Sequence, residues 1–328
     1  MAKYILKRIL LMIPVILGVL TIVFILSAIT PGDPVDQLVG IDAPEAVREA
    51  TRESLGLNDP IIIRYVKYIW NFVSKGDLGI SYYTRQPVIQ EIMNCFPYTM
   101  ILAFVSLGVG VAVGIPLGVV SAVKQYSWLD SAVLVISMVA ASMPNFWLAL
   151  LCLSLFAVDL NWLPVFGVTS PLGWVLPIGV CAVDVMSGIT RITRSSMLEV
   201  IREDYIRTAR AKGQRERVII WRHALQNAMI PVVTSIGATL GSMLGGALTI
   251  ESVFAIPGIG KYMVDAISHR DFPAIQGGVI IFAIVFTIVN LIVDLVYTVI
   301  DPRLKSMFIT KKGKKPPKAA NAEVATNG

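Results

Sequence analysis

Residues 198–231 form a cationic segment between two apolar stretches, and they carry the side chains best suited to bind another molecule. Apolar side chains at 198, 201, 205 and 209 recur at three or four residues, the spacing of one helix face. Glu203 and Arg207 can pair at i, i+4 on another face. Gly213 interrupts the pattern before a second periodic run that reaches Pro231. This predicts noncovalent docking by a helix, a glycine break and a helix at the membrane surface; charge alone is equally compatible with contacts to anionic lipid.

Motifs for covalent chemistry are not evident. Residues 258–261 (GIGK) resemble part of a phosphate-binding loop, but Ala255 and Tyr262 stand where that loop needs a glycine and a hydroxyl residue of the Ser/Thr type. His223 and His269 are far apart and have no metal-ligand spacing. We therefore expect no catalytic residues, no metal site and no cofactor on this chain.

The composition predicts an all-α integral membrane protein. Of the 328 residues 55% are hydrophobic and 15% charged, and the mean hydropathy is +0.71. A spanning helix needs about 20 apolar residues. Six stretches meet that length, near 9–29, 98–122, 130–157, 173–190, 229–252 and 274–300. Residues 1–30 then hold the N-terminus and a retained first span, and residues 98–300 the membrane core.

Both termini are predicted to be cytoplasmic. In that orientation 20 of the 28 Lys and Arg lie inside, nine of them in the loop 191–228 and seven in the tail 301–328. The tail is too polar to form a core, and we predict that it is disordered. This inside excess accounts for the net charge of +6, which therefore gives no indication of nucleic-acid binding.

Residues 31–97 form a polar region outside the membrane. We predict helices at 43–53 and 61–73 within it, separated by a break at Asn58-Asp59-Pro60. Prolines at 116, 144 and 177 can kink the membrane helices beside which they lie.

Glycines recur every four residues in the second and fifth spans. Small residues so spaced let helices approach closely, within the chain or, alternatively, at a partner interface or pathway. Asp184 and Asp294 lie in predicted spans, where they should face protein or water. We expect Asp184 to lie near the cytoplasmic edge and treat Asp294 as a candidate pathway or gate residue. The packing glycines are Gly110, Gly114, Gly118, Gly237, Gly241 and Gly245.

The chain resembles the permeases of ABC importers, and within them the B-type subunit of the dipeptide, oligopeptide and nickel family. The resemblance covers nearly the whole chain, although Arg207 stands where the glutamate that names the family's EAA loop would fall. The matching motifs are PGDP at 31–34, LGL at 55–57, GDLG at 76–79, DYIRTARAKG at 204–213, HALQNA at 223–228 with Pro231, and ESVFAIPGIG at 251–260.

This resemblance implies a type I importer permease of six spans in a bacterial or archaeal inner membrane. Its implied partners are a homologous second permease, two cytoplasmic ATPases and an extracytoplasmic binding protein that docks on residues 31–97. It also adds Glu251 as a candidate pathway or gate residue. The implied ATPase-coupling residues are Glu203, Asp204, Tyr205, Arg207, Thr208, Ala209, Arg210, Ala211, Lys212 and Gly213.

Di- or oligopeptides are the implied substrates, with nickel chelates and glutathione as alternatives. An ion-coupled secondary transporter is a different class, for which Asp294 gives the main support. A membrane receptor or scaffold without transport is a third.

Overall fold

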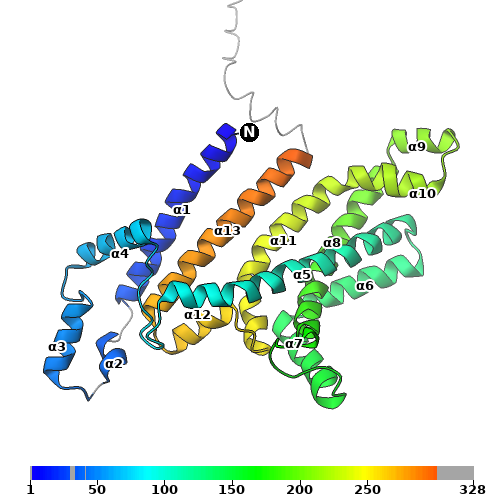
Figure 1. Cartoon of the computed structure of the whole chain (residues 1–328). Coiled ribbons are helices and arrows are strands. Elements are labelled where there is room, and N and C mark those ends of the chain that lie inside the picture. Colours follow the sequence, from blue (N-terminus) through cyan, green and yellow to red (C-terminus); the bar gives the residue numbers. More distant parts are fainter. Residues whose placement is uncertain (1, 30–33, 41, 301–328) are drawn as a thin grey trace, which may run out of the picture.

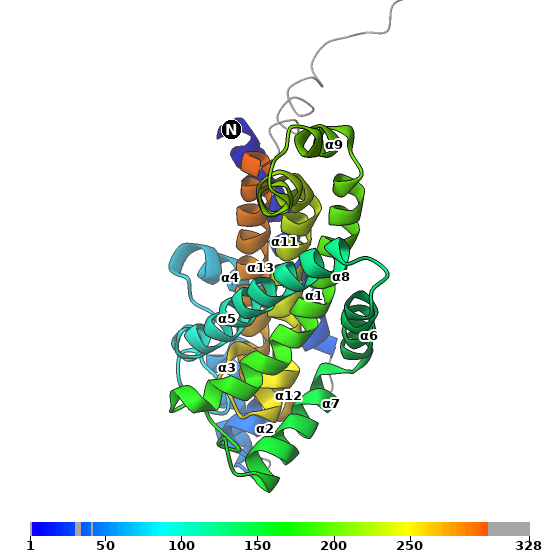
Figure 2. The ribbon, with the colours of Figure 1, turned by 90° about the vertical axis from the view of Figure 1, so that its right-hand side faces the viewer.

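A computed structural model describes residues 2–29, 34–40 and 42–300, leaving out the side chains of 2–9, 37, 244, 246–247, 294 and 296–300. Within that part the chain is helical, and strand pairing is limited to an isolated bridge between Ile80 and Pro87. The start of α1 and the short helix α9 lie at one end of the molecule, while α2, α3, α7 and α12 lie toward the other (Figures 1 and 2). The predicted tail 301–328 lies outside the described residues.

The long helices follow the predicted spans. They are α1 (Ala2–Ile29), α5 (Val88–Val123), α8 (Val175–Ile201), α11 (Leu225–Val253) and α13 (Phe272–Ile300). Among the described residues, four helical segments, belonging to α1, α5, α8 and α13, are long and apolar enough to cross a membrane. The predicted span 229–252 coincides with α11, whose side chains are described only in part, so the count of six stays a prediction.

The predicted span 130–157 is broken. It consists of α6 (Trp128–Ser142), α7 (Asn145–Cys152) and a π-helical continuation, η1 (Leu153–Asp159). The helix axis bends by 101° between α6 and the α7–η1 segment. The residue before a proline is forced toward extended backbone, and Met143 has ψ 126°. Pro144 therefore ends one helix and starts the next. The pair gives a fifth crossing if it forms one span.

Glycines let α5 pack closely on α8. A Cβ at Gly110 would lie 2.6 Å from the Cβ of Val185, and one at Gly118 would lie 2.7 Å from the carbonyl oxygen of Thr190. Gly114 is somewhat less restricted, because its Cβ would lie 3.0 Å from a carbonyl oxygen of α8. For this strip the packing interpretation is confirmed.

The glycines of α11 behave differently from one another. Gly237 is buried, and a Cβ at Gly241 would lie 3.3 Å from Phe286 of α13. Gly245 is exposed and faces open space. Intramolecular packing therefore accounts for part of this strip and leaves Gly245 available to a partner.

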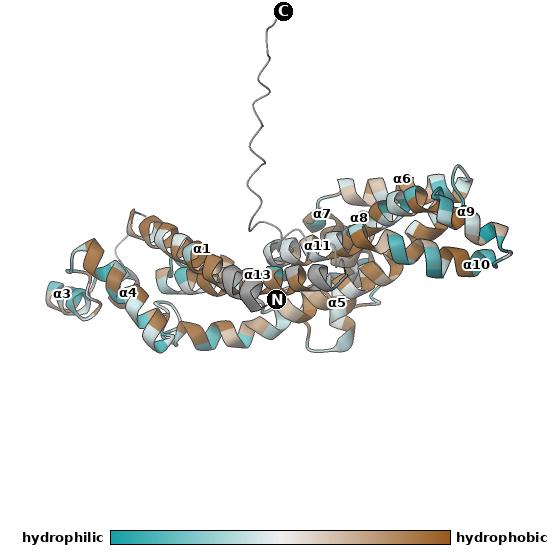
Figure 3. Ribbon diagram, turned by 90° about the horizontal axis from the view of Figure 1, so that it is seen from above, coloured by the Kyte–Doolittle hydropathy of each residue, from teal (hydrophilic) through white to brown (hydrophobic). Residues whose placement is uncertain are grey.

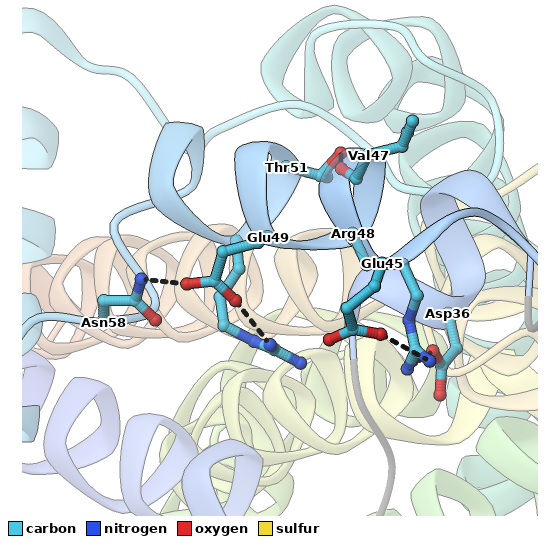
Figure 4. Close-up of polar contacts among 8 residues, drawn as sticks. Asp36, Glu45, Val47, Arg48, Glu49, Thr51 and Asn58 are labelled. Carbon is cyan, nitrogen blue, oxygen red and sulfur yellow. Dashed lines mark hydrogen bonds and ion pairs between the residues drawn. The ribbon is translucent and has the colours of Figure 1, made fainter.

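The region between the first two spans contains α2 (Pro34–Val39), α3 (Glu45–Ser54) and α4 (Ile61–Lys75), so both helices predicted there are confirmed. Hydrophilic residues gather on α3 (Figure 3). Polar contacts hold this region together (Figure 4): Arg48 pairs with Asp36 at 2.5 Å, and Asn58 donates to Glu49 at 3.0 Å. These contacts join α2 to α3 and α3 to the loop before α4.

Candidate functional site

The predicted helix, glycine break and helix is present. It comprises α9 (Asp204–Ala211), a turn at Gly213 with φ 73°, and α10 (Glu216–Val218), which continues through the π-helical segment η3 (Ile219–Ala224) into α11. Asp204 in the first turn and Arg210 in the last turn both interact favourably with the helix dipole. The expected loop 191–228 is mostly helix, because α8 runs to Ile201 and α10 begins at Glu216.

One side chain anchors α9. Ile206 is fully buried in a cluster with Val119 and Ala122 of α5, Met197 of α8, Ile219 and Ala224 of η3 and Ala228 of α11. The sequence pattern placed Leu198, Ile201, Tyr205 and Ala209 on one face of a single helix, but these residues belong to two helices, α8 and α9. The backbone breaks at Arg202 and Glu203, which resets the helix phase and leaves Tyr205 45% exposed. Partial burial and the nearby Glu203 carboxylate raise the pKa of Tyr205, so its phenol stays neutral.

The outer side of α9 is charged. The side chains of Asp204 and Arg207 are 97% and 72% exposed and lie 3.8 Å apart. Arg207 pairs with Asp204 at i, i+3, and not with Glu203 as the spacing predicted. An exposed pair of this kind contributes little stability. Asp204 and Arg207 could therefore exchange this ion pair for contacts with another protein with little loss of stability.

A second ion pair crosses the glycine turn. Arg210 Nε lies 2.7 Å from Glu216 Oε1 and joins the end of α9 to the start of α10. Both side chains line a hollow of about 410 Å³ between these helices and the ends of α5 and α8, together with Arg202 and Ile220. Sequence reasoning missed this pair because it spans the break, where helical spacing does not apply.

A buried ion pair lies at the same end of the long helices. Asp130 at the start of α6 is 3% exposed and accepts two hydrogen bonds from Arg194 of α8, at 2.7 and 2.8 Å. Ser121 of α5 and the Tyr126 backbone N–H also donate to this carboxylate. Bidentate geometry of this kind fixes orientation as well as distance. The partners are too far apart in sequence for any local pattern to have revealed them.

Glu251 lies toward the opposite end and is fully buried. Thr99 of α5 donates to its carboxylate at 2.6 Å, and the Lys261 backbone N–H donates at 3.0 Å. A Cβ at Gly258 or Gly260 would lie within 3 Å of that carboxylate, so the glycines permit the approach. Glu251 thus holds α11, α5 and the start of α12 (Ile259–Ser268) together. Its assignment as a gate stays a prediction.

Asp271 forms a comparable cluster just before α13. Its carboxylate accepts hydrogen bonds from the Ser81 hydroxyl and, at 3.1 Å, from the Tyr82 backbone N–H. Burial raises the pKa of Tyr82. Asp184 is exposed in the middle of α8, and its expected place near the cytoplasmic edge of the membrane stays a prediction. The side chain of Asp294 lies outside the described residues.

Across the residues that the structure describes, no three His, Cys, Asp or Glu side chains are grouped so as to hold a metal ion. The end of the molecule at α9 instead presents an exposed, charged helix that Ile206 fixes to the ends of several long helices.

Comparison with protein families decides the assignment. Residues 114–306 match the family described as binding-protein-dependent transport system inner membrane component, and residues 1–103 match its N-terminal region. The chain belongs to this family. It is therefore an ABC importer permease subunit and a component of the inner membrane. The ion-coupled and non-transport alternatives are set aside by this membership.

Curated relatives of this permease include peptide transporters. It is 40% identical to a dipeptide transport system permease of Alkalihalophilus pseudofirmus, over 93% of this chain and 100% of that protein. It is 38% identical to an oligopeptide permease of Bacillus subtilis, over 93% and 100%. A glutathione permease of Pectobacterium atrosepticum is 39% identical over 93% and 99%.

Solved structures agree with the fold. The methionine ABC transporter MetNI in inward-facing conformations matches with a TM-score of 0.54 at 19% identity, over 65% of this chain and 97% of that chain. An amino acid ABC transporter crystallised with histidines matches with a TM-score of 0.50 at 14% identity, over 66% and 94%.

Proposed function

We propose that this permease translocates di- or oligopeptides and that α9 is the element through which a cytoplasmic ATPase moves it. The peptide part rests on the two peptide permeases to which the chain is 38–40% identical over 93% of its length. Glutathione, itself a tripeptide, is the second candidate because a glutathione permease is equally similar. Nickel chelates remain the third.

The anchoring of α9 carries the coupling proposal. A protein that pushes on its charged outer side also displaces Ile206, whose neighbours belong to α5, α8, η3 and α11. Close-packed interiors transmit such displacements because they have little free volume. The Arg210–Glu216 pair links α9 to the continuous helix that begins at α10. Movement at this surface therefore reaches several membrane helices together.

The remaining components follow from the same proposal. ATP and Mg²⁺ would be held by two cytoplasmic ATPase subunits, a second permease would complete the pathway, and a binding protein would deliver substrate to the region between the first two spans. The chain itself would catalyse no reaction. Exposed Gly245 is a candidate contact with the second permease.

Two experiments test these statements separately. Purification from native membranes, with mass spectrometry of the co-eluting chains, should find a second permease and ATP-binding subunits; a chain that elutes alone would contradict the assembly. In that complex a cysteine at Arg207 should cross-link to an ATPase subunit, whereas one at exposed Ser74 of α4 should not. Equal cross-linking at both positions would contradict docking on α9.

The substrate is tested in proteoliposomes that contain the whole complex and ATP. We expect uptake of a labelled dipeptide or oligopeptide, with weaker competition by glutathione. Uptake of glutathione in preference to every peptide tried would replace the peptide assignment and leave the coupling proposal intact.

A further inference from the structure

Helix α4 has three different faces. Its aromatic face, which includes Tyr68 and Phe72, packs into the buried cluster around Leu20 of α1 and Leu78. Its polar face, with Arg64, Lys67 and Asn71, lines a cavity of about 720 Å³ on the extracytoplasmic side. Its third face is apolar and unpartnered, and consists of Ile62, Val66, Trp70 and Val73, which are 58–76% exposed.

Contacts with α1 set the depth of α4. The hydroxyls of Tyr65 and Thr21 are 2.5 Å apart, and the rings of Tyr65 and Phe24 lie 5.2 Å apart. Both α1 residues belong to the apolar segment Leu10–Ile29. At ~1.5 Å per residue Thr21 lies roughly 12 Å before the end of that segment. The chain has therefore left the spanning helix, passed through α2 and α3, and returned beside it.

Two views agree on this placement. In Figures 1 and 2 α4 lies at a level between the two ends of the molecule, closer to the level of the α1 N-terminus than α2, α3 and α12 are. The neighbouring residues Ile22 and Ile25 of α1 are exposed apolar side chains of a membrane span. Helix α4 thus packs on a span whose exposed apolar side chains are suited to contact lipid.

We infer that α4 is an interfacial helix whose face of Ile62, Val66, Trp70 and Val73 is buried in the outer leaflet of the bilayer. Helices of this kind combine a basic polar face with an apolar face that contains Trp, and they lie at the boundary between headgroups and acyl chains. Lys67 is held on the polar side by Asp59 at 2.6 Å. The polar face turns toward the cavity, and the apolar face turns toward lipid.

Collision accessibility of single nitroxide labels tests the inference. The full-length chain, with its three native cysteines replaced by serine, is purified with the subunits that accompany it and reconstituted in nanodiscs. Labels are placed at I62C and V73C on the apolar face, with N71C on the polar face as the matched control. Thermal unfolding of each labelled sample must match that of the unlabelled one.

At the two apolar positions we expect molecular oxygen, which partitions into lipid, to collide severalfold more often than a water-soluble nickel chelate. The order should reverse at N71C. Nickel accessibility at I62C and V73C as high as at N71C would show that water covers the face. Low accessibility to both reagents would show that a protein covers it. Either result would overturn the inference.

Discussion

Replacing Ile206 with alanine should loosen α9 from the membrane helices. Ile206 is fully buried, and Leu or Ile to Ala substitutions at such sites cost about 2–5 kcal/mol, since transfer energy and cavity formation add. The site lies under a short surface helix that can partly collapse, so we expect the lower part of this range. A loss of about 2 kcal/mol corresponds to a roughly 30-fold higher population of the undocked helix.

Hydrogen exchange measures this population directly. In the purified complex the amides of α9 should exchange roughly 30-fold faster in I206A, while those in the middle of α8 stay unchanged. Val218→Ala is the matched control, because Val218 lies across the glycine break and is 40% exposed. ATP-driven uptake should fall in I206A while ATPase activity persists, since the coupling between them is weakened.

Exchange in α9 that rises no more in I206A than in V218A would refute the argument that Ile206 holds this helix in place. Normal uptake in I206A with undocked α9 would instead refute its role in coupling.

Three other substitutions test features described above. Gly110→Ala should lower the melting temperature in detergent, because overpacking costs about 1–3 kcal/mol, whereas Gly108→Ala, which faces open space in the same helix, should not; equal melting would contradict the packing. At Gly213, where φ is 73°, Asn should be tolerated and Val should abolish uptake with insertion retained; equal uptake in the two variants would count against a strained turn. Thr99→Val removes the side-chain donor to the buried Glu251 carboxylate, leaving the Lys261 backbone N–H, and should destabilise by about 1–3 kcal/mol, with Ser restoring stability; unchanged melting would mean that the Thr99 hydrogen bond contributes nothing.

Sequence patterns were sufficient where a local rule fixes the structure. Glycine at four-residue spacing predicted the close approach along α5, and Gly213 predicted the break after α9. They did not predict which side chain of α9 is buried, because the helix is interrupted at Arg202 and Glu203. Residue spacing alone does not give the rotation between the helices on either side of such an interruption.

The limits of α8 show a different reason for failure. Charged residues from Arg191 onward signal departure from the apolar layer, but the helix continues to Ile201. Charged residues indicate that the helix surface is in contact with water, but the hydrogen bonds of the helix backbone can continue there. Likewise, nothing local links Asp130 to Arg194, since only the packing of α6 on α8 brings them together.

Helix α5 has 36 residues and so a length of about 54 Å, well beyond the ~30 Å hydrocarbon layer. It contacts the α9 cluster near one end and Glu251 through Thr99 nearer the other. Because one continuous helix carries both contacts, with Pro116 between them, its tilt is shared by the two sides of the membrane. A substitution that changes this tilt alters the inner and outer surfaces at once, so engineering of substrate range at the outer side must be checked against ATPase coupling at the inner one.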